Sequence, residues 1–76
     1  MTRLPAVSGA DVVRALEKDG FIIIRQRGSH AVLRHADGRS TVVPIHGNET
    51  LGPGLLRKIG RDVELSREEL IALLRA

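Results

Sequence analysis

Two tight turn signals limit the topology of this chain more than any other feature of its sequence. Asp37-Gly38 is a strong hairpin signal, because both residue types tolerate positive φ angles, and Arg27-Gly28 is a weaker one. Runs rich in β-branched and aromatic residues flank these turns near residues 21–26, 30–35 and 40–45. Because connections this short join only antiparallel neighbours, the sequence predicts a three-stranded antiparallel sheet.

Helical patterns lie on both sides of the strands. A Ser-x-x-Asp capping pair precedes a helix predicted over about residues 9–18. A second helix is predicted from about Gly52 toward Asp62, with Gly60 either ending it or weakening its continuation. A Ser-x-x-Glu capping box then begins a short C-terminal helix. The predicted class is therefore α+β, with the first two helices on one face of the sheet.

Composition restricts the class of protein further. The 76 residues are enough for one domain, which we expect to span residues 1–76. The absence of cysteine excludes a disulfide framework and a thiolate zinc site, so apolar packing has to stabilise the fold. The longest apolar run, at residues 70–74, is too short to cross a bilayer, and residues 1–9 lack the apolar stretch of a secretory signal. We therefore expect a cytoplasmic protein with no membrane partner.

The positive charge is concentrated in the first part of the chain. Residues 1–46 carry seven Lys or Arg and four Asp or Glu, whereas residues 47–76 carry five of each. The formal net charge of +3 therefore belongs entirely to the first segment. A localised basic excess favours an anionic partner, either nucleic acid or an acidic protein.

The register predicted from the turns separates two faces of the sheet. With two-residue loops at both turns, His30 pairs with Arg25 on one side and faces Ile45 on the other. The core face is then predicted to carry Ile22, Ile24, Ala31, Leu33 and Val42. The open face is predicted to carry Arg25, His30, Val32, Arg34, Thr41 and Val43. A slip of one residue in a register reverses the faces of the strand concerned.

His30 is the first candidate for chemistry on the open face. Cleavage of RNA by its neighbouring 2′-hydroxyl needs a base, an acid for the departing 5′-oxygen, and cations around the phosphate. Histidine can serve in either proton role near neutral pH, and Arg25, Arg27 and Arg34 are predicted phosphate partners. The competing interpretation is a surface strand histidine beside solvated arginines.

Other residues complete the list of candidates. Ser29 and His46 are candidate RNA contacts, although His46 is equally consistent with a structural role where the chain leaves the sheet. His35 is expected at the surface of the hairpin end, on the face opposite His30. We find no metal-binding pattern and expect no cofactor. The single aromatic residue, Phe21, is expected in the core, which disfavours base stacking and favours backbone and shape contacts with RNA.

Several segments together resemble the HicA toxin family over nearly the whole chain. They are the helix end Asp19-Gly20-Phe21, the triplet Gly28-Ser29-His30, the hairpin Arg34–Arg39, the strand end Val43–His46 and the segment Gly52–Ile59. The resemblance implies an αβββα fold like that of double-stranded-RNA-binding domains. It also implies a toxin of a type II toxin–antitoxin system that cleaves mRNA independently of the ribosome through the histidine of the triplet, and an antitoxin of the HicB type as partner. Two positions depart from the family pattern: Gly60 replaces a larger apolar residue, and Glu64 replaces a common glycine before the last helix.

Two other functions fit the same residues. A non-catalytic RNA-binding module of the same fold would use His30 only to contact phosphate. A protein-interaction module would present the basic sheet to an acidic partner and bind RNA weakly. Of the three, the sequence favours the metal-independent endoribonuclease.

Overall fold

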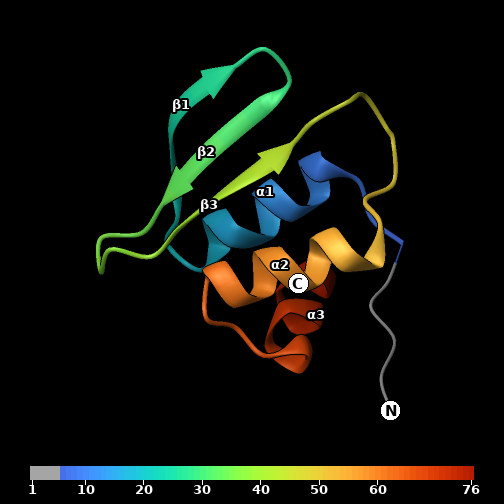
Figure 1. The fold of residues 1–76 in the computed structure, drawn as a ribbon. Helices are drawn as coiled ribbons and strands as arrows, with labels where there is room; N and C mark the ends of the chain where they lie inside the picture. The colour runs from blue at the N-terminus through green and yellow to red at the C-terminus, as the bar shows by residue number, and fades with distance from the viewer. Residues whose placement is uncertain (1–5) are drawn as a thin grey trace.

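Helices and strands follow one another in the predicted order. The computed structural model describes residues 6–76. Its elements are α1 (Gly9–Lys18), β1 (Ile22–Arg27), β2 (His30–Arg34), β3 (Ser40–Pro44), α2 (Pro53–Asp62) and α3 (Arg67–Arg75). The strands form one antiparallel sheet in the order β1-β2-β3 (Figure 1). The α+β prediction is confirmed, and the arrangement is consistent with the αβββα fold of double-stranded-RNA-binding domains.

Helix α1 begins and ends as its sequence predicts. The Ser8 hydroxyl accepts a hydrogen bond from the Asp11 N–H, and the Asp11 carboxylate accepts one from the Ser8 N–H. This reciprocal pair satisfies two N–H groups that the first helical turn leaves without partners. After Asp19, Gly20 takes φ +104°, which turns the chain so that Phe21 enters the core.

Between β2 and β3, His35 and Arg39 enclose a loop of three residues, 36–38, and the predicted two-residue loop at Asp37-Gly38 is wrong. The His35 N–H donates to the Arg39 carbonyl at 2.8 Å and closes the loop. Only Gly38 takes a positive φ, +101°, while the Asp37 carboxylate accepts from the Arg39 N–H at 3.0 Å. A three-residue loop with glycine in this third position is a common hairpin connection. The register of β3 against β2 therefore differs from the prediction by one residue.

The turn between β1 and β2 is also displaced from its predicted position. Its two loop residues are Gly28-Ser29, and Gly28 takes φ +54°. His30 therefore pairs with Arg27, and the predicted pairing with Arg25 is wrong. A further irregularity lies between Ile23 and Arg25, where the register shifts along β1.

The one-residue change in the register of β3 and the irregularity within β1 correct the predicted faces of the sheet. Ala31 and Leu33 lie in the core as expected, but Thr41 and Val43 join them there. Val42, Ile22 and Ile24, which the prediction placed in the core, are exposed. Because the β3 register slipped by one residue, every side chain of that strand changed face.

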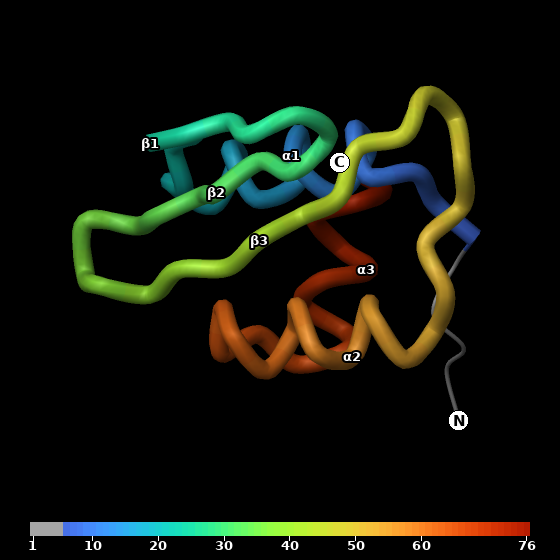
Figure 2. The backbone as a smooth tube through the Cα atoms, turned by 45° about the horizontal axis from the view of Figure 1, so that its top comes forward, coloured from blue at the N-terminus to red at the C-terminus, as the bar shows by residue number. Residues whose placement is uncertain are grey.

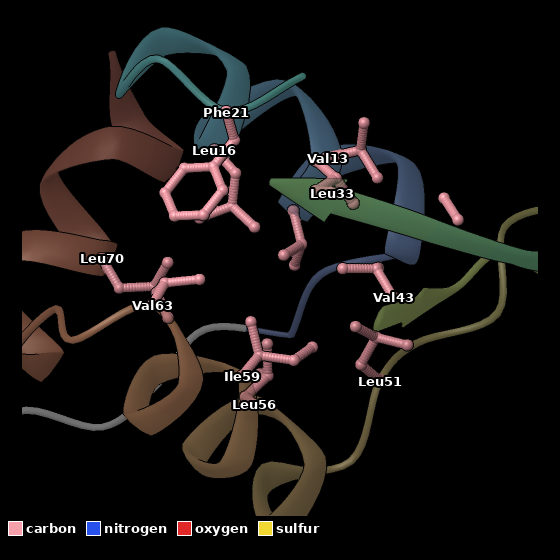
Figure 3. Close-up of a cluster of buried hydrophobic side chains, with 12 residues drawn as sticks. Val13, Leu16, Phe21, Leu33, Val43, Leu51, Leu56, Ile59, Val63 and Leu70 are labelled. Carbon is pink, nitrogen blue, oxygen red and sulfur yellow. The ribbon is translucent and has the colours of Figure 1, made fainter. Parts of the chain in front are cut away.

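The core lies between β2, β3 and the three helices (Figure 3). Phe21 and Leu33 are fully buried within it, and each helix contributes apolar residues that meet them. The buried core residues are Val12, Val13, Leu16, Phe21, Ala31, Leu33, Val43, Leu51, Leu56, Ile59, Val63 and Leu70. Helices α1 and α2 both contact β3, so the prediction that they cover the same face is confirmed (Figure 2). Within residues 6–76, no helix or strand covers the opposite face of the sheet, which we call the open face.

Helix α2 continues through Gly60 and ends at Asp62. Beyond it, Glu64 takes φ +56°, a left-handed conformation that glycine adopts more easily. The N–H groups of Glu64 and Leu65 donate back to the carbonyls of Arg61 and Gly60, which forms a complete C-terminal capping motif. A glycine at this position would fit the same turn without strain.

Candidate active site on the open face of the sheet

His30 is the first residue of β2 and lies on the open face. The next residue, Ala31, is fully buried, so alternation along the strand directs His30 away from the core. The imidazole is exposed to solvent. The predicted exposure of His30 is confirmed, and the side chain has no part in the packing of the core.

His46 lies beside His30, and both are next to the turn between β1 and β2. Strand β3 ends at Pro44, and the Ile45 N–H donates to the Ser29 carbonyl, which holds the chain end against that turn. The Ser29 Oγ and the His46 Nε2 are 3.3 Å apart, within hydrogen-bonding distance. The two imidazole centroids are 6.1 Å apart, with the rings nearly perpendicular. Ser29, His30 and His46 thus form one group, which we call the histidine cluster.

The three predicted arginines lie at different distances along the open face. Arg27 is the backbone partner of His30, and Arg25 pairs with Val32, at the next open-face position. Arg34 lies at the far end of β2, four residues from His30 and therefore roughly 13 Å along the strand. Arg27 thus lies next to the histidine cluster, Arg25 lies two residues farther along β1, and Arg34 lies well outside the cluster.

The positive charge of these arginines is not neutralised by nearby carboxylates. Within residues 6–76, none of Arg25, Arg27 and Arg34 forms a salt bridge, and all three are exposed. Arg39, in contrast, pairs with two aspartates and lies over the Phe21 ring, so its role is structural. Unpaired guanidinium groups on an open surface are suited to binding phosphate oxygens.

His35 is not part of the site, and it is not the surface residue that we predicted. Its Nε2 is 3.0 Å from the Asp19 carbonyl, and its Nδ1 accepts from the Asp37 N–H at 3.1 Å. The ring also packs edge-on against Phe21. Through its two ring nitrogens and its contact with Phe21, this half-buried imidazole therefore connects the hairpin to the end of α1.

The closeness of His30 and His46 is the feature that sequence reasoning missed. The predicted register paired His30 with Ile45, whereas the structure pairs it with Pro44. The only sequence signal for this register is Gly38, which suits the last position of a three-residue loop but fits the predicted two-residue loop equally well. No group of three His, Cys, Asp or Glu side chains within the described residues could hold a metal ion.

The described helices are also too short or too polar for any of them to cross a membrane.

The open face presents two imidazoles, a hydroxyl and unpaired arginines on one accessible surface. Such a group can transfer protons near neutral pH beside a bound phosphate.

Comparisons with known proteins give the family of this chain. No curated protein sequence matches it significantly. The family model described as the HicA toxin of bacterial toxin–antitoxin systems matches residues 9–65, which is more than half of the chain. The matched segment contains all the strands and the whole histidine cluster. The chain therefore belongs to the HicA toxin family and is a toxin of a toxin–antitoxin system.

Proposed function

We propose that this toxin is an endoribonuclease that cleaves mRNA independently of the ribosome, with His30 as a catalytic residue and without a metal ion. One observation carries the proposal: an exposed imidazole stands on an open sheet face beside arginines that form no salt bridge within residues 6–76. Membership of the toxin family supports an RNA substrate in general.

The proposed reaction is attack of a 2′-hydroxyl on the adjacent phosphorus. His30 takes part in proton transfer, and Arg27 and Arg25 contact the phosphate oxygens as negative charge accumulates on them. Ser29 and His46 are further contacts to the RNA beside His30, and Arg34 contacts the backbone farther along the strand. No step of this reaction needs a metal ion or a small-molecule cofactor.

The mode of RNA binding follows from the surface. Phe21, the one aromatic residue in the sequence, is buried in the core and cannot stack on a base. Contacts to the backbone and to the shape of the RNA therefore provide binding, as they do in domains that read A-form RNA. Such binding depends strongly on salt, because each phosphate contact releases a counterion.

The decisive experiment compares native protein with His30→Ala on a long mRNA, in the absence of ribosomes. We expect the variant to lose cleavage by about 10²–10⁴-fold, the usual contribution of general acid–base catalysis. Its unfolding free energy should stay within about 0.5 kcal/mol of native, because the removed side chain is exposed. Native cleavage should persist in EDTA.

Three outcomes would contradict the proposal. Near-native cleavage by folded His30→Ala protein would remove His30 from the mechanism, and complete inhibition by EDTA would contradict metal independence. A native protein that binds RNA without producing fragments would be the non-catalytic RNA-binding module instead.

A second experiment maps the RNA-binding surface. Replacing Arg25 and Arg34 by alanine should weaken RNA binding and reduce its salt dependence by about one phosphate contact per arginine. Replacing Arg61 and Arg75, two exposed arginines of the C-terminal helices, is the matched control and should have a smaller effect. Equal losses in the two double variants would refute the mapping.

The partner and location of the toxin complete the proposal. We propose an antitoxin of the HicB type with an acidic surface, because the basic open face that binds RNA suits such a partner equally well. Binding there would block access of mRNA to His30. We place both proteins in the cytoplasm, where the mRNA substrate is found.

A further inference from the structure

We propose that His46 is a second catalytic residue and that His30 and His46 each perform one of the two proton transfers of RNA cleavage. This inference rests on the proposed ribonuclease function and deepens it. It also extends the role that the sequence suggested for His46, which was a contact to RNA.

The position of His46 supports a direct role. The Ile45 N–H donates to the Ser29 carbonyl, and the His46 Nε2 lies 3.3 Å from the Ser29 Oγ, so the ring is held over the start of β2. A hydrogen bond from either ring reaches about 2.6–3.2 Å. Two rings whose centroids are 6.1 Å apart can therefore contact different oxygens of one phosphate group between them.

The chemistry requires two groups in opposite protonation states. One neutral imidazole removes the proton of the 2′-hydroxyl while the 2′-oxygen forms a bond to phosphorus. As the bond from phosphorus to the 5′-oxygen breaks, the other imidazole, which is protonated, gives its proton to that oxygen. The products are a 2′,3′-cyclic phosphate and a 5′-hydroxyl, and the two imidazoles have exchanged protonation states. Within the described residues, only one other histidine exists, and His35 is held in the hairpin packing.

Other charged residues also lie near the histidine pair. Arg27 and Arg25 come from β1, and Glu49 comes from the turn after His46, where its N–H donates to the His46 carbonyl at 3.0 Å. From α1, the uncharged Gly9 lies against the Pro44 carbonyl. Histidine is the residue type that ordinarily changes charge between about pH 5 and 8, so we assign a change of rate in that range to the imidazoles.

The first test compares His46→Gln with Ser29→Ala on RNA. Glutamine can keep the hydrogen bond to the Ser29 hydroxyl but cannot transfer a proton, whereas Ser29→Ala removes the bond and keeps the imidazole. We expect His46→Gln to lose about 10²-fold or more and Ser29→Ala to lose less. A purely structural role for His46 predicts the reverse order. Circular dichroism and thermal unfolding check that both variants are folded.

The pH dependence of kcat/KM is the second test of the inference. Native protein should give a bell-shaped profile, because one imidazole has to be neutral and the other protonated. The residual activity of His46→Gln should lose one limb of the bell and keep the other. A native profile with a single limb would overturn the inference.

The third test determines which histidine gives its proton to the departing 5′-oxygen. A cleavage site is first mapped in the long mRNA, and an oligonucleotide is then made with sulfur in place of the 5′-bridging oxygen at that site. A thiol has a pKa of about 8.5, so a thiolate departs without receiving a proton. We expect the loss caused by one of His30→Ala and His46→Gln to shrink at least about tenfold on this substrate, and the other loss to remain.

The results distinguish this inference from the proposed function. If His30→Ala is inactive while His46→Gln cleaves RNA within about twofold of native, the inference fails and the ribonuclease proposal stands. If sulfur rescues both variants or neither, the division of proton transfers between the histidines is wrong. If native protein does not cleave RNA, the proposed function itself fails.

Discussion

Strands β1 and β3 flank the same central strand, yet only β3 contributes buried side chains. Both contain consecutive β-branched residues. In β3, Thr41 and Val43 are 4% and 0% exposed, because α1 and α2 cover that side of the sheet. In β1, Ile22 is 63% exposed and no residue of the strand is buried. β-Branched composition thus favours a strand, but the neighbouring helices decide whether the strand joins the core.

The two edges of the sheet therefore serve different purposes. The β3 edge provides the stability of the fold, and Thr41 anchors it to α2 by donating a hydrogen bond of 2.9 Å to the Asp62 carboxylate. The β1 edge carries Arg25 and Arg27 on an accessible surface beside His30. Substitutions at the β3 edge should therefore change stability, and those at the β1 edge should change RNA binding.

The largest effect on stability is expected in β3. Val43→Ala removes two methyl groups from a fully buried site and should lower the unfolding free energy by about 2 kcal/mol. For a domain of this size, that corresponds to a fall in Tm of roughly 8–16 °C. Ile24→Ala is the matched control in β1, and chemical denaturation of the two variants measures the difference. Equal losses would show that β1 is packed as tightly as β3.

A smaller effect is expected from acid, again on the β3 side. The hydrogen bond from Lys58 lowers the pKa of Asp62, with help from the Thr41 hydroxyl and against the effect of burial. Because the folded pKa lies below the unfolded value of about 3.9, this contribution to stability is present above that value and is lost as pH falls through the folded pKa.

Asp62→Asn tests this contribution in urea titrations at a series of pH values. The variant should be less stable than native near neutrality, and the difference should shrink toward pH 3. The capping carboxylates Asp11 and Glu69 also have lowered pKa values, so native protein and Asp62→Asn should both lose further stability in acid. A stability difference that is the same at all pH values would contradict the role of the Asp62 charge.

The smallest effect is expected at the exposed edge. Ile22→Thr keeps a β-branched side chain and should change the unfolding free energy by no more than about 0.5 kcal/mol. Cleavage of RNA by this variant should also remain near native, because Ile22 pairs with Arg34 at the end of the sheet away from His30. A loss as large as that of Val43→Ala would mean that Ile22 is buried in solution.

The sequence predicted the elements better than their register. Capping boxes and glycine turns are local signals, and α1, α3 and both hairpins formed where these signals lie. Register depends on loop length, which Asp37-Gly38 does not determine, since the dipeptide fits two-residue and three-residue loops. One added loop residue moved Val42 from the predicted core to the surface.

The predicted position of His30 on the open face was correct, although the turn before it was predicted one residue too early. The turn between β1 and β2 moved by one residue, which shifted the pairing by two and left Arg25 and His30 on the same face. The exposure of β1 and the closeness of His46 to His30 could not be predicted, because both depend on helix placement and on the exact register of β3.

Gly9 has a consequence for the mutational tolerance of the chain. A Cβ atom at this position would lie 2.0 Å from the Pro44 carbonyl oxygen and 3.2 Å from the Ile45 Cα. Both contacts are with backbone, so even alanine would displace the segment that carries His46. A saturation scan for loss of toxicity should therefore mark position 9 as strictly as a catalytic position, although this residue lies in α1 and has no side chain to react.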